Sequence, residues 1–438
     1  MKRRFIFGLA VAALVVVNLI GAKVYSAGSS GKGIKDAPLP NLELFTTVLE
    51  RVRKDYVDGT NLTYQKLVYG ALKGMVDQLD PHSEFLDPEE YRELQSDTQG
   101  NFGGLGIQVG MKDGFVTVIS PMDDSPGFKA GILSGDRIIK IGGRSTVNLP
   151  LPDAVKELRG VPGTKVTITI SRPSTQTNID FTLTRAVINI DMVKDINGKK
   201  EFPIGEDHIG YIRLVQFGER TGDELEAGLK KLKAQGMTGL VLDLRGNPGG
   251  LLDQAVEVCG KFLPRNQLVV STEGRDPMEK DIHRARGNGD EIKNVPIVVL
   301  ANLGSASAAE IVTGCLQDLH RAIVLGEKTF GKGSVQNVME LEDGSALKLT
   351  IAKYYTPSHK VIHEHGITPD IFVPMTDQEE QDLFIQRQPG AMEALDEKTR
   401  QRVMNAHDIQ LYRAVDLLKG IYLYTQLAPN GPGKIAAK

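Results

Sequence analysis

The chain has 438 residues, of which 41% are hydrophobic and 24% charged, an ordinary composition for a globular protein with two or three domains. The formal net charge of −3 gives no indication of nucleic-acid binding. Two cysteines, Cys259 and Cys315, are too few for a multi-disulfide framework, and both stand in apolar helical patterns that predict buried thiols.

The N-terminal segment, residues 1–27, has the features of a targeting sequence. A basic start, "MKRR", precedes an apolar run from Phe5 to Ala22 and a small-residue stretch that ends near Ala27. This order is typical of a signal peptide, and the run is only slightly short for a membrane anchor, so both alternatives stay open. Either one predicts an extracytoplasmic protein, periplasmic or secreted, which this segment could anchor to the inner membrane.

Residues 28–98 form a polar linker followed by a helical region. Apolar residues recur there at helical spacing: Phe45, Val48, Leu49, Val52, Tyr56, Val68, Leu72, Met75 and Leu79. The stretch "LDPHSEFLDPEEY" then interrupts the pattern with two Asp-Pro pairs and starts another short helix.

Residues 99–185 change to strand-like periodicity. "GGLGIQVG", "GFVTVIS", "DRIIKIGG" and "TKVTITISR" alternate or run apolar over strand lengths, while "SPGFKAGI" and "LPDAVKELRG" are typical of short helices. The pattern predicts a small barrel-like β domain with two helices.

Residues 186–375 alternate buried-strand and helix patterns, which predicts an α/β fold with parallel strands. The expected strands are "HIGYIRLV", "GLVLDLR", "VPIVVLAN" and "RAIVLGE". Residues 376–438 are helical again, and one face carries Leu411, Ala414, Val415, Leu418 and Tyr422. That face could pack on the chain's own core or on a partner.

The stretch "GSASAAEI", residues 304–311, supports two interpretations. Ser307 and Glu310 have the S-x-x-E spacing of a capping box, but Ser307 could equally be a nucleophile presented at the start of a helix.

A lysine in "GEKTFGKGSVQ" could supply the base. The segment nearly matches a phosphate-binding loop, but Gly333 stands where the magnesium-binding hydroxyl is required and a strand pattern follows, so we reject nucleotide binding. Lys332 can act as a base only if burial lowers the pKa of its amine. Gln336 could orient that amine without adding charge, and period-two alternation places Lys332, Ser334 and Gln336 on one face of an extended chain.

A glycine-rich turn in "LDLRGNPGGLLDQAV" could supply oxyanion donors. The N–H groups of Gly249 or Gly250, together with that of Ala308, could point at a developing negative charge, although a tight turn without a ligand is the alternative. His363 and His365 in "HEHG" have no further ligands nearby in the sequence, so we predict no metal site.

Together, "GSASAAEI", "FGKGSVQ" and "DLRGNPGG" resemble the C-terminal (tail-specific) processing peptidases, which are serine endopeptidases with a Ser–Lys dyad and a PDZ domain. The resemblance extends over nearly the whole mature chain and includes "LDPHSEFLDPEEY" and "GITPDI" (366–371). It implies a crotonase-like α/β protease core at residues 186–375, a PDZ domain at 99–185 and no cofactor.

Carried onto this chain, the resemblance assigns the catalytic roles. Ser307 matches the nucleophile, Lys332 the general base and Gln336 the residue that positions it, with Gly249 and Ala308 as oxyanion donors. Ala309 departs from the many relatives that carry a second serine there, but that position is outside the dyad.

The resemblance also implies how substrate is selected. The PDZ loop, Gly104, Leu105, Gly106 and Ile107, would present N–H groups to a terminal carboxylate. An apolar C-terminal side chain would enter near Ala154, Val155 and Leu158, and Arg159 is the candidate gating contact.

The expected partners are protein or peptide substrates with apolar C-termini, a second copy of the chain in a homo-oligomer such as a dimer, and an adaptor protein in some cases, but not nucleic acid. A PDZ scaffold without activity is the alternative function, which intact Ser307, Lys332 and Gln336 disfavour.

Overall fold

A computed structural model describes residues 37–59, 62–112, 114–122, 124–173, 175–276, 278, 280–287, 292–387, 392 and 395–427. The segment predicted as signal peptide or membrane anchor lies outside these residues. Among the helices in the described ranges, none is both long and apolar enough to cross a membrane.

The chain divides into two units, the first ending at Leu79 and the second beginning at Asp80. The first unit contains two helices where the apolar periodicity predicted them, α2 (Pro38–Asp55) and α3 (Tyr64–Val76). No residue of α2 is buried, and its apolar side chains, such as Leu39 and Leu42, are exposed.

The second unit opens with the "LDPHSEFLDPEEY" segment. It forms a short strand, β1 (Glu84–Leu86), and then helix α4 (Pro88–Gln99), which Asp87 caps by accepting the N–H groups of Glu89 and Glu90 at 3.0 Å each. Pro88 occupies the first helical position, where its missing N–H costs nothing.

A small β domain follows α4, with the four strands and two short helices that the sequence predicts and two strands, β6 and β8, that it did not. Its antiparallel sheet has the order β3-β4-β5-β7-β8, with β6 on β5. The strands are β3 (Ile107–Lys112), β4 (Phe115–Pro121), β5 (Arg137–Ile141), β6 (Arg144–Ser145), β7 (Lys165–Arg172) and β8 (Thr177–Thr184), and the helices α5 (Pro126–Lys129) and α6 (Leu151–Leu158). A separate core of twelve buried apolar residues fills it.

The chain enters and leaves this domain through one antiparallel ribbon. Strand β2 (Asn101–Gly104) pairs with β9 (Ala186–Asn189), so that Asn101 lies opposite Asn189 and Gly104 opposite Ala186.

The α/β region contains a six-stranded sheet of order β10-β11-β12-β15-β16-β19. All neighbouring pairs from β11 to β19 are parallel, as the alternating pattern predicts, and β10 is antiparallel at one edge. The strands are β10 (Val193–Lys194), β11 (Ile209–Leu214), β12 (Gly239–Asp243), β15 (Ile297–Ala301), β16 (Ile323–Gly326) and β19 (Ile371–Phe372).

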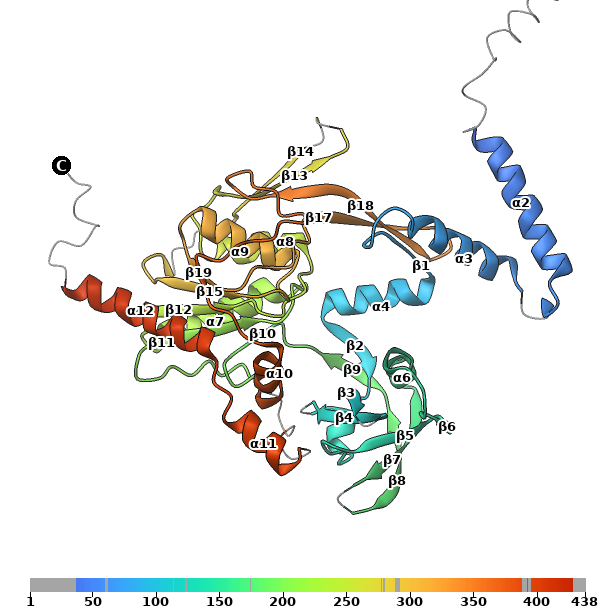
Figure 1. The fold of residues 1–438 in the computed structure, drawn as a ribbon, viewed down its shortest axis with the longest axis horizontal. Helices are drawn as coiled ribbons and strands as arrows, with labels where there is room; N and C mark the ends of the chain where they lie inside the picture. Colours follow the sequence, from blue (N-terminus) through green and yellow to red (C-terminus); the bar gives the residue numbers. More distant parts are fainter. Residues whose placement is uncertain are drawn as a thin grey trace, which may run out of the picture. The chain divides into compact units, whose positions relative to one another are not determined.

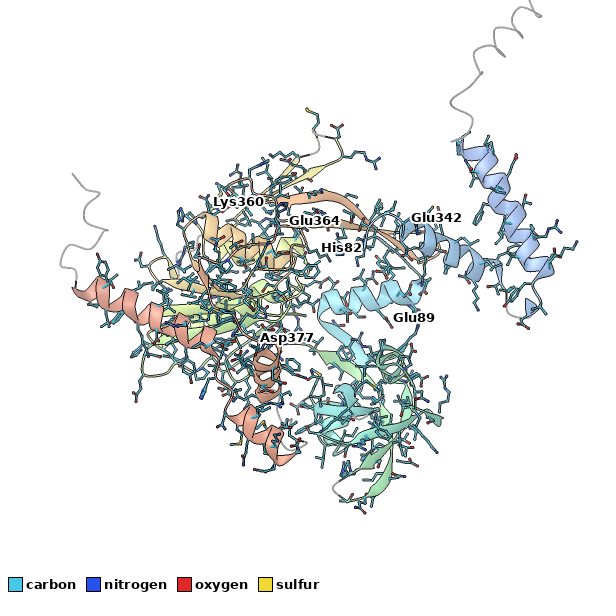
Figure 2. All side chains as sticks on the ribbon, in the orientation of Figure 1. His82, Glu89, Glu342, Lys360, Glu364 and Asp377 are labelled. Carbon is cyan, nitrogen blue, oxygen red and sulfur yellow. The ribbon has the colours of Figure 1, made fainter. Side chains whose placement is uncertain are left out.

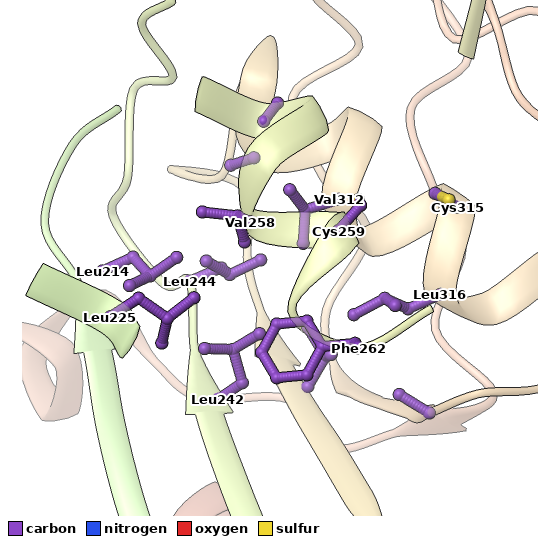
Figure 3. Packing of buried hydrophobic residues seen from close by; sticks show 14 of the residues in the cluster. Leu214, Leu225, Leu242, Leu244, Val258, Cys259, Phe262, Val312, Cys315 and Leu316 are labelled. Carbon is purple, nitrogen blue, oxygen red and sulfur yellow. The ribbon is translucent and has the colours of Figure 1, made fainter. Parts of the chain in front are cut away.

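Helices cover both faces of this sheet (Figure 1). On one face, α7 (Thr221–Ala234), α8 (Leu252–Gly260) and α9 (Ala308–Asp318) pack against alternate residues such as Leu240 and Leu242. Both cysteines are buried, unbridged members of this core. Figure 3 labels Leu214, Leu225, Leu242, Leu244, Val258, Cys259, Phe262, Val312, Cys315 and Leu316 from it.

The other face of the sheet is covered by the C-terminal helix α12 (Ile409–Leu427). Ala414 and Leu418 are buried against Val241 and Val298, so the amphipathic face packs on the chain's own core. Tyr422 is the exception and remains 42% exposed. Helices α10 (Asp377–Gln386) and α11 (Glu397–Met404) precede α12.

A second sheet, which the sequence analysis did not assemble, supports the lysine segment. Its order is β1-β18-β13-β14, with β17 paired to β18, and all its pairs are antiparallel. The remaining strands are β13 (Leu268–Gly274), β14 (Lys280–Arg284), β17 (Ser334–Glu340) and β18 (Ala346–Tyr355).

Candidate active site

Ser307 lies between strand β15 and helix α9 in a strained backbone conformation. Its φ of 54° and ψ of −116° are unusual for a residue with a side chain, and such a conformation persists only where the surroundings hold it. Ser305 supplies part of that support, because its hydroxyl donates to the carbonyl of Leu244 at 2.8 Å and accepts the N–H of Asn302 at 3.1 Å. Ser305 is therefore a structural residue of this turn.

The capping interpretation of Ser307 accounts for only part of its environment. The capping box predicted from the spacing is present, because the Glu310 carboxylate accepts the N–H of Ser307 at 2.9 Å and the Ser307 side chain faces the backbone N–H of Glu310. Ser307 is 7% exposed and stands at the start of α9.

Glu310 joins the serine segment to the lysine segment. It is fully buried, and its carboxylate accepts four hydrogen bonds: from the Thr329 hydroxyl at 2.6 Å, and from the N–H groups of Gly331, Lys332 and Ser307 at 2.7, 2.8 and 2.9 Å. Burial raises the pKa of this carboxyl, and the four donors oppose that rise. One oxygen, Oε2, binds both Ser307 and Lys332, so their backbone nitrogens are at most two hydrogen-bond lengths apart.

Lys332 is half-buried on the loop that precedes β17. Burial and the positive charge of Lys348 lower the pKa of its amine, while the negative charge of Glu310 opposes the fall. Within the described residues, no hydrogen bond joins the Lys332 amine to the Ser307 hydroxyl, so the predicted dyad is not hydrogen-bonded in this state. Catalytic hydrogen bonds are often long before substrate binds.

Gln336 lies on β17 beside Ser334. Its Nε2 donates to the Ser334 hydroxyl at 2.8 Å and to the Thr350 hydroxyl of β18 at 3.3 Å. The sequence predicted that Lys332, Ser334 and Gln336 share one face of an extended strand, and for Lys332 this is wrong. Lys332 lies in the loop before β17, which begins only at Ser334 because Gly331 and Gly333 shape that loop. The register of β17 also shifts between Val335 and Gln336.

His82 joins this neighbourhood from the segment before β1, and Figure 2 labels it. Its pKa is lowered by burial first and then by the positive charge of Lys332, which places the imidazole within electrostatic reach of that amine. Sequence analysis assigned no role to this histidine.

The glycine turn contacts the nucleophile directly. Gly249 has a φ of 97°, and a Cβ built on it would stand 2.7 Å from Cβ of Ser307 and 2.7 Å from the carbonyl oxygen of Ala306. Only glycine fits so close to another backbone.

The structure distinguishes Gly249 from Gly250 as oxyanion donors, which the sequence could not do. The N–H of Gly249 already donates to the side chain of Asn247 at 2.8 Å, so Gly249 does not offer a free donor in this state. The N–H groups of Gly250 and Ala308 have no partner within the described ranges. Sequence analysis did not identify Asn247. It is fully buried, and its backbone carbonyl accepts the N–H of Ala306.

The segment predicted to bind a terminal carboxylate connects β2 to β3. Gly104 ends β2, Leu105 is buried in the domain core, and Ile107 begins β3. The carbonyl of Gly106 accepts the N–H of Met122 at 2.8 Å and the Ser125 hydroxyl at 2.9 Å, which fixes the loop.

The predicted apolar pocket on α6 is only partly available. Ala154 and Leu158 are 0% and 5% exposed and belong to the domain core, because their spacing of four residues turns both toward the sheet. Only Val155 is partly exposed.

Arg159 ends α6 and links it to α4. Its guanidinium lies 3.3 Å from the Asp97 carboxylate and 4.6 Å from the centre of the Phe102 ring. A second ion pair joins Lys156 of α6 to Glu89 of α4 at 3.0 Å. The candidate gating residue therefore stands where the β domain meets α4, the helix that follows β1.

No group of three or more histidine, cysteine, aspartate or glutamate side chains in the described part of the chain could hold a metal ion.

Residues 208–373, which contain the serine, the lysine and both glycines, match Peptidase family S41. Residues 93–171 match the PDZ domain. A "Carboxy-terminal-processing protease" of Bartonella bacilliformis is 45% identical over 337 residues, which are 76% of this chain and 75% of the relative. The chain belongs to peptidase family S41.

Two further proteins are similar to this chain. The "Carboxy-terminal processing protease CtpA" of Bacillus subtilis is 35% identical over 82% of this chain and 72% of its own length. A solved photosystem II D1 C-terminal processing protease is 30% identical, with a TM-score of 0.44 over 76% of this chain and 92% of its own. The predicted resemblance is confirmed, and this S41 peptidase is a C-terminal processing serine protease with a PDZ domain.

Proposed function

We propose that Ser307 is the nucleophile and Lys332 the general base of an extracytoplasmic endopeptidase that recognises the C-terminal tails of its substrates through the PDZ domain. The observation that carries the dyad is the Glu310 carboxylate, which accepts the backbone N–H groups of both residues on one oxygen. A fully buried acid with four donors holds the serine segment and the lysine segment as one unit.

In this mechanism, neutral Lys332 removes the proton of the Ser307 hydroxyl as its oxygen attacks a peptide carbonyl. The lowered pKa of Lys332 supports this role, because it raises the fraction of neutral amine near pH 7. The protonated lysine then donates to the leaving amine, and water hydrolyses the acyl-enzyme with the lysine again as base.

The oxyanion would be held by backbone N–H groups. Ala308 is the first residue of α9, where N–H groups have no partner inside the helix, and Gly250 is exposed, with no partner for its N–H among the described residues. Gly249 would serve only if substrate displaced its bond to Asn247.

Tail recognition rests on the PDZ match and on the fixed loop at Gly104–Ile107. Strand β3 would pair with the tail, and Val155 would border its last side chain. The link between Arg159 and Asp97 supports a gating role for this end of α6, because α4 directly follows β1, which belongs to the sheet that carries Gln336.

The proposed location outside the cytoplasm and the possible anchor rest on residues 1–27 alone. A homodimer is supported by α2, most of whose apolar side chains are exposed. An adaptor that delivers substrate stays a proposal without a structural observation of its own.

The test is cleavage of an unstructured substrate with an apolar C-terminus, followed by mass spectrometry. S307A and K332A should each abolish cleavage, whereas K328A, an exposed lysine of the same loop, should retain it. Undiminished turnover by S307A would refute the nucleophile, and binding of the tail without cleavage by the wild type would indicate the scaffold instead.

A further inference from the structure

The amide of Gln336 has both of its N–H donors committed. One donates to the Ser334 hydroxyl at 2.8 Å and the other to the Thr350 hydroxyl at 3.3 Å. Since a carboxamide nitrogen carries two protons, no donor remains, and only the oxygen Oε1 is left to act on a third group. An oxygen can accept a hydrogen bond from the Lys332 amine, whereas an NH₂ group facing that amine would repel its protonated form.

The orientation of the Gln336 amide is set by the hydrogen bond that its partner Thr350 makes to Asp80. The hydroxyl of Thr350 has a single proton, and it donates that proton to the Asp80 carboxylate at 3.2 Å. An ionised carboxylate can only accept, so Thr350 must point its lone pairs at Gln336 and receive the NH₂ group. The protons available in the hydrogen bonds from Gln336 to Thr350 and from Thr350 to Asp80 therefore exclude the alternative orientation of the Gln336 amide, in which its oxygen would face Thr350.

Asp80 is well held for this purpose. Its carboxylate accepts the N–H groups of His82 and Ser83 at 2.8 and 2.9 Å and the Ser83 hydroxyl at 2.7 Å. These bonds lower its pKa and outweigh the opposing effect of burial, so the group stays ionised at neutral pH. Ser83 in turn accepts the backbone N–H of Thr350 at 3.0 Å, which fixes Asp80 to the strand whose hydroxyl it binds.

The register of the sheet maintains this geometry. Strand β1 begins one residue after Ser83 and pairs with β18 from Glu84 opposite Lys348 to Leu86 opposite Ala346. On its other edge, β18 pairs with β17, where Gln336 stands opposite Thr350. The segment before β1 and the strand that carries Gln336 therefore occupy opposite edges of one strand, and Thr350 lies between them.

We propose that Asp80 is a positioning residue of the protease: through the Thr350 hydroxyl it sets the orientation of the Gln336 amide, so that the amide oxygen faces the general base. This inference rests on the proposed roles of Ser307 and Lys332. It assigns a task to the Asp of "LDPHSEF", which stands 270 residues from Thr350 in the chain.

The test replaces the acceptor-only group with one that can also donate. In D80N, the new NH₂ can donate to Thr350, whose hydroxyl proton is then free to bind a flipped Gln336. We expect kcat for peptide cleavage to fall about tenfold or more with KM little changed, since only general-base alignment is lost. T350V, which removes the relay, should match D80N, and T350S should retain wild-type kcat. D77N, an exposed aspartate nearby, is the matched control.

A double-mutant cycle separates positioning from folding. If Asp80 acts through Gln336, D80N should cause no further loss of kcat in a Q336A background, although Q336A alone is impaired. Independent losses in the double variant, or full activity of D80N or T350V, would overturn the inference. Should Q336A itself be fully active while S307A and K332A are dead, the inference fails and the proposed function stands. If S307A or K332A retains activity, the proposed function itself fails.

Discussion

Glu310 offers the sharpest test of the site, because one atom can be exchanged in a fully buried carboxylate. In E310Q, one acceptor oxygen becomes an NH₂ donor. Whichever oxygen is replaced, at least one buried backbone N–H, that of Gly331 or those of Ser307 and Lys332, then faces a donor instead of an acceptor.

The expected cost follows from these bonds. A buried N–H left without an acceptor costs about 1–3 kcal/mol, and the loss of charge weakens the remaining bonds. We therefore expect the free energy of unfolding, measured in urea, to fall by about 2–4 kcal/mol. Displacement of the serine or the lysine by about 1 Å should reduce kcat about 100-fold.

The pH profile distinguishes this role from simple destabilisation. The negative charge of Glu310 raises the pKa of Lys332, so its removal should lower that pKa and move the acid limb of kcat to lower pH. The assay is cleavage of a quenched-fluorescent peptide between pH 5 and 10, with E206Q, an exposed glutamate, as the control. An acid limb that stays in place, or moves to higher pH, would refute the coupling between Glu310 and the base.

Further substitutions test separate parts of the structure. K332M should abolish cleavage yet raise the free energy of unfolding at pH 7, because folding lowers the pKa of this amine and so disfavours its charged form; the difference from wild type in urea unfolding should shrink as pH rises toward 10.5, where the unfolded amine also loses its charge. R245M should destabilise the fold by about 3–5 kcal/mol in the same assay, since it removes the arginine partner of buried Asp243 and leaves buried Asp408 with Arg387 alone; a loss of only about 0.5 kcal/mol, as at an exposed site, would contradict this. G249A should reduce kcat far more than G163A, which has a similar positive φ but open space around its Cβ, and equal effects would show that steric contact is unimportant. R159A should change the thermal midpoint little, because its ion pair is half-exposed, while it alters the ratio of cleavage rates for free-acid and amidated tails; an unchanged ratio argues against gating.

Much of the fold could be predicted because local patterns encode it. The four apolar runs bounded by turns became parallel strands, and the five-residue face of the C-terminal helix packed on the sheet except at its last member, Tyr422. The second sheet was not assembled from the sequence, although β18 alternates Leu347, Leu349 and Ile351 with Lys348 and Thr350, because local patterns do not indicate which distant strands pair with it.

The site was harder to predict where its contacts are distant in the chain. The S-x-x-E spacing drew attention to Glu310 but explained it as a local cap, and nothing in that spacing indicates the N–H groups of Gly331 and Lys332. Asp80 and Thr350 carry no joint pattern, because strand pairing alone brings them together. Gly249 and Gly250 look alike in sequence, and only the bond to Asn247 tells them apart.

The ribbon of β2 and β9 has a consequence for how the chain assembles. The PDZ match lies in sequence between β1 and the parallel sheet, so the protease must close a long loop before β1 can reach β18. Once Gly104 pairs with Ala186, the two ends of that loop lie about 5 Å apart. For the loop-closure entropy of the remaining chain, the folded domain is then equivalent to a short turn. A folded PDZ domain thus removes most of the loop-closure entropy from the folding of the catalytic half, and a graft of a two-residue turn across this ribbon is the natural way to excise it.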